Sequence, residues 1–203
     1  MAFKKLHPHI KNILESQEIT TATPFQKASI PIIKSGANVF CTAKVGSGKT
    51  TALILTTLHK IKCEEAGVAP RAIVLVENNQ KALDLYDAFL PYTRYTSMRL
   101  YCGNEKEHID LLKSEIFEGI DILIATPKIV NKLLLLEGLN TTQVKIFSID
   151  DAEFLKDKTA NANVLAITQS IRKCQYVLYS ESITSGLKKL NSYFMEYAKT
   201  VSV

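Results

Sequence analysis

The chain has 203 residues, 46% of them hydrophobic and 22% charged, and a net charge of +5. These values are ordinary for a globular protein with one domain, or at most two small ones. No apolar run is long enough to span a bilayer, and residues 1–15 lack a signal-peptide core, so we expect no membrane contact and a cytoplasmic location. The four cysteines and four histidines are scattered without metal-ligand spacing.

The mild positive charge is carried largely by lysine. It is compatible with a polyanionic partner but does not demonstrate one, because lysine-rich solvated faces are common. Arginine, the usual bidentate ligand of phosphate, is scarce. The arginines are Arg71, Arg94, Arg99 and Arg172.

Helical and strand patterns alternate along the chain. In order they predict helix 8–16, helix 24–34, strand 39–42, helix 49–63, strand 72–76, helix 79–90, strand 98–102, helix 105–117, strand 120–125, helix 127–135, strand 144–149, helix 160–171, strand 175–180, helix 183–197 and strand 200–203.

The helix that begins at residue 79 is expected to end before Pro91, since proline does not continue a helix. Strand 72–76 is a continuous apolar run, which is typical of a strand covered on both faces. Strands alternating with helices predict an α/β domain, a mostly parallel sheet with helices on both faces. In such a sheet ligands bind at the carboxyl ends of the strands, so functional residues should directly follow strands.

The first such segment runs from Ala43 to Thr51 between an apolar strand and an apolar helix. Its spacing is Ala-x-x-x-x-Gly-Lys-Thr, typical of a phosphate-binding loop in the strand–loop–helix setting that it requires. Gly46 and Gly48 let backbone N–H groups converge on a phosphate at a helix N-terminus. The alternative is an ordinary glycine turn. The candidate nucleotide-binding residues of the loop are Ala43, Val45, Gly46, Ser47, Gly48, Lys49, Thr50 and Thr51.

Lys49 would reach the β- and γ-phosphates, and the Thr50 hydroxyl would complete a Mg²⁺ shell. A second magnesium-side ligand is expected at the end of another apolar strand, and Asp150 stands there, after residues 144–149. Through water, Asp150 would hold the ion opposite Thr50. The alternative for Asp150 is an acidic cap of the following turn.

With these motifs, the chain resembles the first RecA-like domain of a DEAD-box ATP-dependent RNA helicase, over residues 3–203. The phosphate loop resembles that family's Ala-x-Thr-Gly-Ser-Gly-Lys-Thr, with Val45 in place of its threonine. Residues 150–153 stand where the Asp-Glu-Ala-Asp signature belongs, and residues 180–182 stand for Ser-Ala-Thr. The resemblance implies catalytic roles for Lys49, Asp150, Asp151, Ser180 and Ser182.

The resemblance also implies a three-layer RecA-like fold for residues 1–203, with an adenine-reading Q-motif region over about residues 1–36. Gln26 would hydrogen-bond the adenine edge and Phe3 would stack nearby. The implied ligands are ATP, Mg²⁺ and RNA. The implied partner is a second RecA-like domain, which residues 1–203 do not contain.

Three RNA-contact segments of the family have lost residues here. Its Pro-Thr-Arg-Glu-Leu-Ala segment corresponds to residues 77–82, which have no arginine and a new acid, Glu77. Its Gly-Gly pair keeps only Gly103, and its Thr-Pro-Gly-Arg keeps only Thr126 and Pro127, followed by Lys128. Because phosphate contacts supply most non-specific affinity, we expect RNA binding to be weak. Lys81 and Lys128 would compensate in part as point charges.

The family's water-positioning glutamate is Asp151 here. The loss of one methylene retracts the carboxylate by about 1.5 Å, one C–C bond. A misplacement of about 1 Å can lower the rate about a hundredfold. We therefore expect ATP binding with slow hydrolysis. Glu153 replaces the last aspartate of the signature and should meet Ser180 or Ser182.

Two other functions remain open from the sequence. A catalytically weak, nucleotide-responsive binding module, or pseudo-helicase, fits the lost RNA contacts and Asp151. A small-molecule kinase would share the phosphate loop, but it should carry an arginine-rich lid, and this chain has few arginines.

Overall fold

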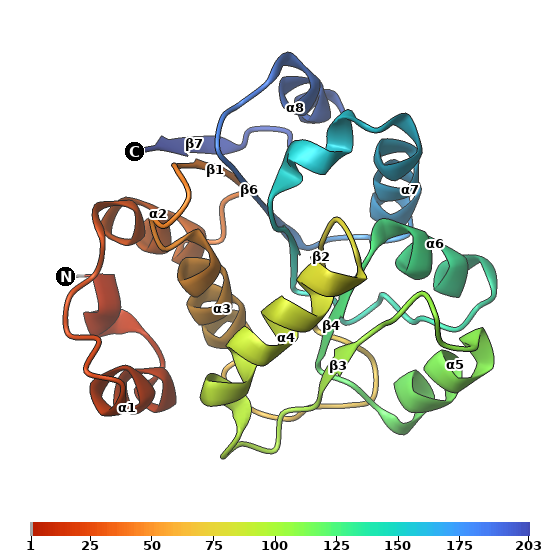
Figure 1. Ribbon diagram of the computed structural model, residues 1–203, viewed down its shortest axis with the longest axis horizontal. Helices are drawn as coiled ribbons and strands as arrows, with labels where there is room; N and C mark the ends of the chain where they lie inside the picture. Colours follow the sequence, from red (N-terminus) through yellow and green to blue (C-terminus); the bar gives the residue numbers. More distant parts are fainter. Residues whose placement is uncertain (1) are drawn as a thin grey trace.

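The computed structural model describes residues 2–203, and seven strands in that range form one sheet with the order β3-β4-β2-β5-β6-β1-β7 (Figure 1). Every neighbouring pair of strands is parallel. The predicted α/β fold with a parallel sheet is therefore confirmed. The strands are β1 (Val39–Thr42), β2 (Ala72–Leu75), β3 (Leu100–Cys102), β4 (Ile122–Ala125), β5 (Ile146–Ile149), β6 (Gln175–Ser180) and β7 (Lys199–Ser202).

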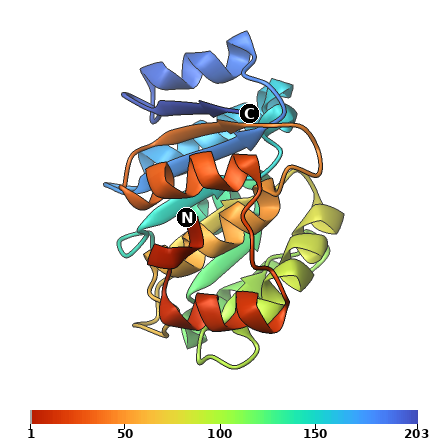
Figure 2. The ribbon, with the colours of Figure 1, turned by 90° about the vertical axis from the view of Figure 1, so that its left-hand side faces the viewer.

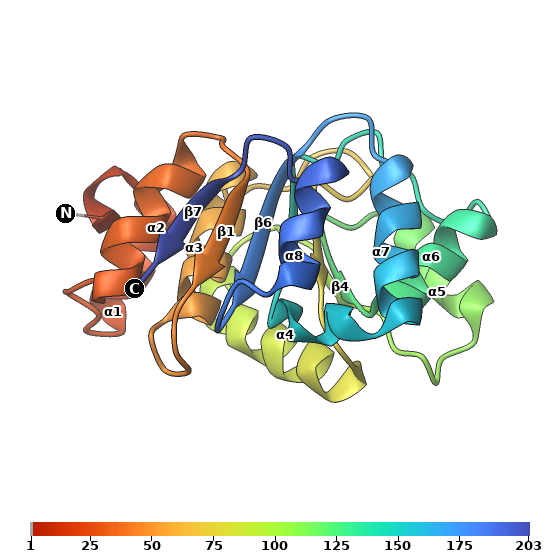
Figure 3. The same cartoon turned by 90° about the horizontal axis from the view of Figure 1, so that it is seen from above.

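Helices cover both faces of the sheet, and α1 and α2 lie on the opposite side from α6 and α7 when the molecule is seen from above (Figure 3). Within residues 2–203, no helix combines the length and the apolar character needed to cross a membrane. The α-helices are α1 (Pro8–Ser16), α2 (Pro24–Lys34), α3 (Lys49–Lys60), α4 (Asn79–Thr93), α5 (Ile109–Glu118), α6 (Pro127–Leu135), α7 (Lys158–Gln169) and α8 (Ser185–Lys189). The 3-10 helices are η1 (Ala2–Lys5), η2 (Ala152–Lys156) and η3 (Leu190–Ser192).

Two hydrophobic clusters fill the spaces between the layers, because successive strand residues point to opposite faces. Ile73 and Val74 of β2 illustrate this: both are fully buried, but Val74 packs under α1–α4 and Ile73 under α5–α8. Figure 2, turned by 90°, shows the N-terminal helices lying over the strands. The result is the three-layer arrangement that the resemblance implies.

Helix α4 does not end before Pro91, as the sequence analysis predicts, but continues to Thr93. Proline removes a backbone donor, which costs most in a helix interior and less in the last turn. Phe89 and Tyr92 are buried on either side of it, and the Arg94 N–H still donates to the Leu90 carbonyl at 2.9 Å. Burial of this last turn against the N-terminal helices outweighs the missing hydrogen bond.

The single helix predicted over residues 183–197 is also wrong. The structure has the short α8, then η3, and then turns in which Tyr197 adopts a left-handed conformation with φ of 56°. Leu187, Leu190 and Met195 are all buried. The spacing of Leu187 and Leu190 is helical, but a turn rather than a helix brings Met195 into the core, where it is 0% exposed. Other element ends differ from prediction by a few residues.

Candidate functional site

The candidate site residues that follow strands all lie at the same end of the sheet, because the carboxyl ends of parallel strands lie together. Strands β5, β6 and β1 are neighbours, so the segments after them lie together. They carry the phosphate loop, the acidic pair and the segment Ser180–Ser182. Strands β3, β4 and β2 are neighbours in the other half of the sheet. The sheet order therefore places the candidate nucleotide-binding segments in one half of the sheet and the candidate RNA-contact segments in the other.

The phosphate loop has the backbone that its glycines predict. Gly46 and Gly48 have φ of 77° and 91°, in the region that favours glycine, and Gly48 is the N-cap of α3. Lys49 is 7% exposed, and its ammonium donates to the carbonyls of Ala43, at 2.5 Å, and Lys44, at 3.2 Å. These carbonyl oxygens accept the hydrogen bonds that the Lys49 ammonium would otherwise donate to a bound phosphate.

The other loop residues differ in exposure. Val45 is 81% exposed and Thr50 is also exposed, whereas Ser47 and Thr51 are half-buried. The Ser47 hydroxyl is itself buried and has no hydrogen-bond partner. An unpartnered hydroxyl inside a loop of this spacing is a donor available to an anionic ligand.

Gln26 supports the phosphate loop in this structure. Its Oε1 accepts from the Thr23 N–H at 3.1 Å, while Thr23 Oγ1 accepts from the Gln26 N–H at 3.1 Å, which makes a capping box at the start of α2. Its Nε2 donates to the Gly48 carbonyl at 3.3 Å, and the Thr23 hydroxyl donates to the Ser47 carbonyl at 2.7 Å. Adenine reading by Gln26 stays a prediction.

Phe3 lies in η1, partly buried against the core. Together with Ile19 and Thr20 it lines a cavity of about 250 Å³ beside α1. Its stacking on an adenine also stays a prediction.

Asp150 directly follows β5, at the carboxyl end of the strand. Its Oδ1 is buried and has no hydrogen-bond partner. Burial, and then the neighbouring charge of Asp151, raise the pKa of Asp150 to about 6, while Lys81 and Lys49 act in the opposite direction. A buried carboxylate oxygen with no partner beside a phosphate loop fits a hard cation, which prefers oxygen ligands.

The structure does not show Asp150 as the cap of the following turn. Asp151, not Asp150, stands at the N-cap of η2, and its side chain makes no capping hydrogen bond. Within residues 2–203, no group of three or more His, Cys, Asp or Glu side chains could hold a metal.

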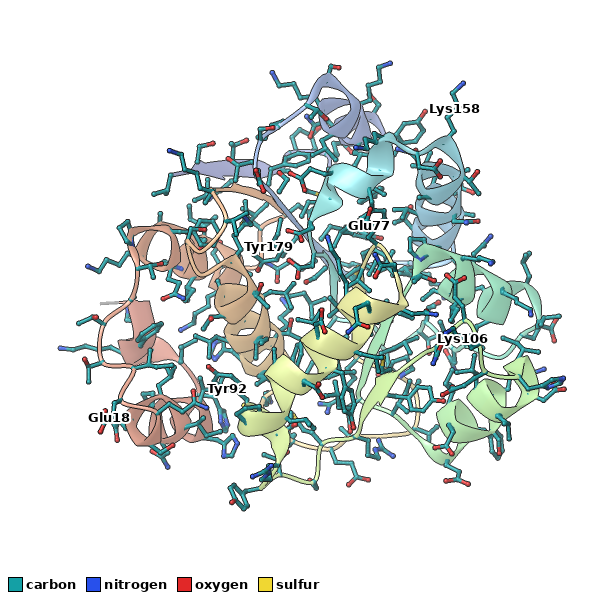
Figure 4. All side chains as sticks on the ribbon, in the orientation of Figure 1. Glu18, Glu77, Tyr92, Lys106, Lys158 and Tyr179 are labelled. Carbon is teal, nitrogen blue, oxygen red and sulfur yellow. The ribbon has the colours of Figure 1, made fainter. Side chains whose placement is uncertain are left out.

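Asp151 has a left-handed backbone, with φ of 47° and ψ of 59°. Its carboxylate accepts from the Lys81 ammonium at 3.0 Å, and Lys81 also pairs with Glu77 at 3.1 Å. Figure 4 labels Glu77 near the start of α4. Asp151, the acid expected to position water, therefore forms an ion pair with a lysine from the half of the sheet that carries the candidate RNA-contact segments.

Glu153 is expected to meet Ser180 or Ser182, but its Oε1 instead accepts from the backbone N–H of Glu181, which lies between them. Ser180 is buried at the end of β6, whereas Ser182 is exposed. Ser182 and Thr42 line an open cavity of about 720 Å³ at the carboxyl ends of β1, β6 and β7, next to the phosphate loop.

The three candidate RNA-contact residues lie together after β3 and β4. The Gly103 N–H donates to the Ile124 carbonyl at 2.9 Å, and Thr126 is the N-cap of α6. The Thr126 hydroxyl donates to Glu105 Oε1 at 2.7 Å and the Lys128 ammonium pairs with Glu105 Oε2 at 3.0 Å.

Glu105 and the pairing of Lys81 with Asp151 could not be predicted from the sequence. Neither has a signal in the spacing of the motifs. Lys81 and Asp151 are 70 positions apart, and only the adjacency of β2 and β5 brings them together.

Comparison with known proteins agrees with this geometry. Residues 23–190 match the sequence profile of the DEAD/DEAH box helicase family. The chain is 29% identical over 195 residues to a probable ATP-dependent RNA helicase ddx42 of Dictyostelium discoideum, covering 93% of this chain and 19% of that protein. It is 30% identical over 202 residues to the pre-mRNA-processing ATP-dependent RNA helicase PRP5 of Kluyveromyces lactis, covering 92% of this chain and 24% of that protein.

Among solved structures, a DEAD box protein from the hyperthermophile Methanococcus jannaschii superposes with a TM-score of 0.89 at 18% identity, covering 98% of this chain and 55% of that one. This likeness shows the RecA-like fold. The chain spans about a fifth to a quarter of the two helicases just described and about half of this structure. On the strength of the match over residues 23–190, the chain belongs to the DEAD/DEAH box helicase family.

Proposed function

We propose that this chain is the ATP-binding domain of a DEAD-box RNA helicase. It would bind ATP with Mg²⁺ and couple that binding, and slow hydrolysis, to RNA binding or unwinding together with a second RecA-like domain. The observation that supports this most is the convergence of Lys49, Asp150 and the Ser180–Ser182 segment after the neighbouring strands β1, β5 and β6.

The chain's own groups have distinct roles in this proposal. The backbone of Gly46–Gly48 and the Lys49 ammonium bind phosphate oxygens, which replace the carbonyls that Lys49 now contacts. Thr50 and Asp150 are the residues that would hold Mg²⁺, which neutralises charge on the phosphates when it is bound. Asp151 would orient the attacking water, and Glu153 holds the segment after β6 beside it.

Replacement of Lys49 by alanine tests the nucleotide site. We expect the affinity for a fluorescent ATP analogue to fall by about ten- to a hundredfold, because a charged hydrogen bond to phosphate is lost. Lys44→Ala is the matched control, since Lys44 is an exposed lysine of the same loop. Unchanged affinity in Lys49→Ala would overturn the proposal.

The pseudo-helicase alternative is favoured by one observation, the ion pair that holds Asp151 against Lys81. The two functions differ in turnover. In a protein that joins this chain to a second RecA-like domain, RNA-stimulated phosphate release supports the helicase. Tight ATP binding without turnover, with or without RNA, supports the pseudo-helicase.

A further inference from the structure

Glu105 lies in a loop that is pressed against the start of α6. A Cβ added to Gly103 would stand 3.2 Å from Ala125 Cβ and 3.3 Å from Ile129 Cγ2, so only glycine fits there without displacing a neighbour. The loop after β3 therefore passes directly over the N-terminus of α6.

Helix α4 fixes the same loop from the other side. The Asn79 side chain donates to Asn104 Oδ1 at 3.0 Å, and its Oδ1 accepts from the Glu105 N–H at 3.2 Å. Asn104 Oδ1 also accepts from the Lys106 N–H at 3.0 Å. The backbone of Glu105 is thus positioned by contacts with two helices before its side chain makes any contact.

The Glu105 carboxylate then takes two donors at the start of α6. Thr126, which is 1% exposed, donates its hydroxyl to Oε1 at 2.7 Å, and Lys128 places its ammonium 3.0 Å from Oε2. The Thr126 hydrogen bond, followed by those from Lys128, lowers the pKa of Glu105, although burial acts in the opposite direction. The carboxylate is therefore anionic at neutral pH.

A hydroxyl, an ammonium and a helix N-terminus are the donors that proteins offer to a nucleic-acid phosphate. We infer that the Glu105 carboxylate occupies the place of an RNA phosphate at the start of α6 and competes with RNA for Thr126 and Lys128. This inference rests on the proposed function. It assigns to Glu105 the control of RNA affinity at that site.

The second lysine that could compensate for lost RNA contacts is held in the same way. Lys81 pairs with Glu77 at 3.1 Å and with Asp151 at 3.0 Å. Lys81 and Lys128, the two lysines expected to compensate for lost RNA contacts, are thus both paired with carboxylates of the chain itself. RNA must displace a carboxylate from each lysine that it contacts.

Glu105→Gln tests the inference, because glutamine keeps an acceptor for Thr126 and removes only the charge. Binding of a fluorescein-labelled oligouridylate is followed by anisotropy over a series of KCl concentrations, without nucleotide. We expect about fivefold tighter binding at low salt. We also expect the slope of log K against log salt to become more negative by about 0.7. This is the increment for one added phosphate contact on a single strand.

Glu107→Gln is the matched control. It changes the net charge equally two positions away, and Glu107 contacts the Tyr101 hydroxyl at 3.3 Å rather than a lysine. A second control, Glu105→Gln combined with Lys128→Met, should lose the gain. Thermal unfolding and circular dichroism confirm that each variant is folded, and Glu105→Ala repeats the test if the glutamine variant is not.

If the wild-type protein binds RNA and Glu105→Gln binds it with the same affinity, this inference alone is overturned. An equal gain in affinity in Glu107→Gln would also overturn it alone. No binding by any of these proteins at low salt would overturn the RNA part of the proposed function together with the inference.

Discussion

Asp151 stands where the family signature is expected to carry a glutamate, and the proposed hydrolysis depends on the reach of this side chain. The left-handed backbone, with φ of 47°, fixes the direction in which its short side chain leaves the chain. The carboxylate pairs with Lys81, and both side chains are partly exposed, so the ion pair is weak and reversible. Side-chain length, more than the ion pair, should therefore limit how this acid acts on water.

An Asp151→Glu variant should hydrolyse ATP faster in a protein that joins this chain to a second RecA-like domain. Restoring one methylene moves the carboxylate about 1.5 Å outward, and correction of a misplacement of that size raises the rate by up to about a hundredfold. Phosphate release at saturating RNA is the measurement.

Asp110→Glu is the control, since it adds the same methylene to an exposed aspartate in the first turn of α5. No rate increase in Asp151→Glu would mean that the short acid is not the limiting defect.

At the scale of elements, the start of α2 and the phosphate loop form one unit. Gln26 caps α2 through Thr23 and donates to Gly48 in the same rotamer. A Cβ on Gly48 would lie 2.5 Å from Gln26 Nε2, so the two segments are in direct contact. Changes in Gln26 should therefore affect the loop itself.

Gln26→Ala separates loop support from adenine reading. We expect the affinity for GTP to fall because the loop that binds phosphate loses its support, and the affinity for ATP to fall further because the predicted adenine contact is lost as well. Stability should fall by about 1 kcal/mol from the lost cap. Isothermal titration with both nucleotides is the measurement. A loss confined to ATP would instead assign the side chain to adenine.

The amino ends of three neighbouring strands are joined by one buried acid, Asp121, which precedes β4. It is 0% exposed and accepts from Arg71 Nη2 at 2.7 Å, before β2, and from Arg99 Nε at 3.1 Å, before β3. Burial alone would raise the pKa of Asp121, but the hydrogen bonds from Arg99, Arg71 and the Ala66 N–H outweigh it and hold the pKa below its usual range.

Asp121→Asn should lower the free energy of unfolding by about 3–5 kcal/mol, because it leaves buried Arg71 without its partner. Since the folded pKa is depressed, the stabilisation is present above the unfolded pKa of about 3.9 and is lost as pH falls through the folded value. Urea unfolding from pH 7 downward should show the wild-type advantage shrinking only below about pH 4. Asp110→Asn, on the surface, should behave like wild type.

The sequence predicts the strands, and the helix starts that carry a capping residue, because local chemistry sets them. The start predicted at residue 105 is wrong: α5 begins at Ile109, and His108 at its N-cap makes no side-chain hydrogen bond. Thr23, Thr126 and Gly48 stand at the helix starts where capping rules place them. Helix ends depend on burial that only the fold decides, as Pro91 shows. The phosphate loop and Asp150 follow from strand-end positions, whereas the pairing of Lys81 with Asp151 requires the sheet order, which the sequence does not contain.

At the scale of the whole molecule, the sheet order decides how nucleotide and RNA sites could communicate. The nucleotide segments follow β5, β6 and β1, and the RNA-contact segments follow β2, β4 and β3, with β2 and β5 as the shared border. The ion pair between Lys81 and Asp151 crosses that border. It is therefore positioned to transmit a change at one site to the other.

The positions of the arginines bear on the expected rate of ATP turnover. Its arginines lie at the amino ends of the strands: Arg71, Arg99 and Arg172 precede β2, β3 and β6, and Arg94 follows α4. The phosphate loop lies at the opposite, carboxyl ends of the strands. No arginine of residues 2–203 thus stands where charge would develop on a transferred phosphate.

We therefore expect the isolated chain to bind ATP but to turn it over at least about a thousandfold more slowly than a two-domain DEAD-box protein, because an arginine finger contributes on the order of that factor. Release of labelled phosphate under single-turnover conditions, alongside titration of a fluorescent ATP analogue, separates binding from chemistry. Turnover within about tenfold of the two-domain protein would mean that a cation of this edge, such as Lys49 or Lys81, already supplies the missing charge.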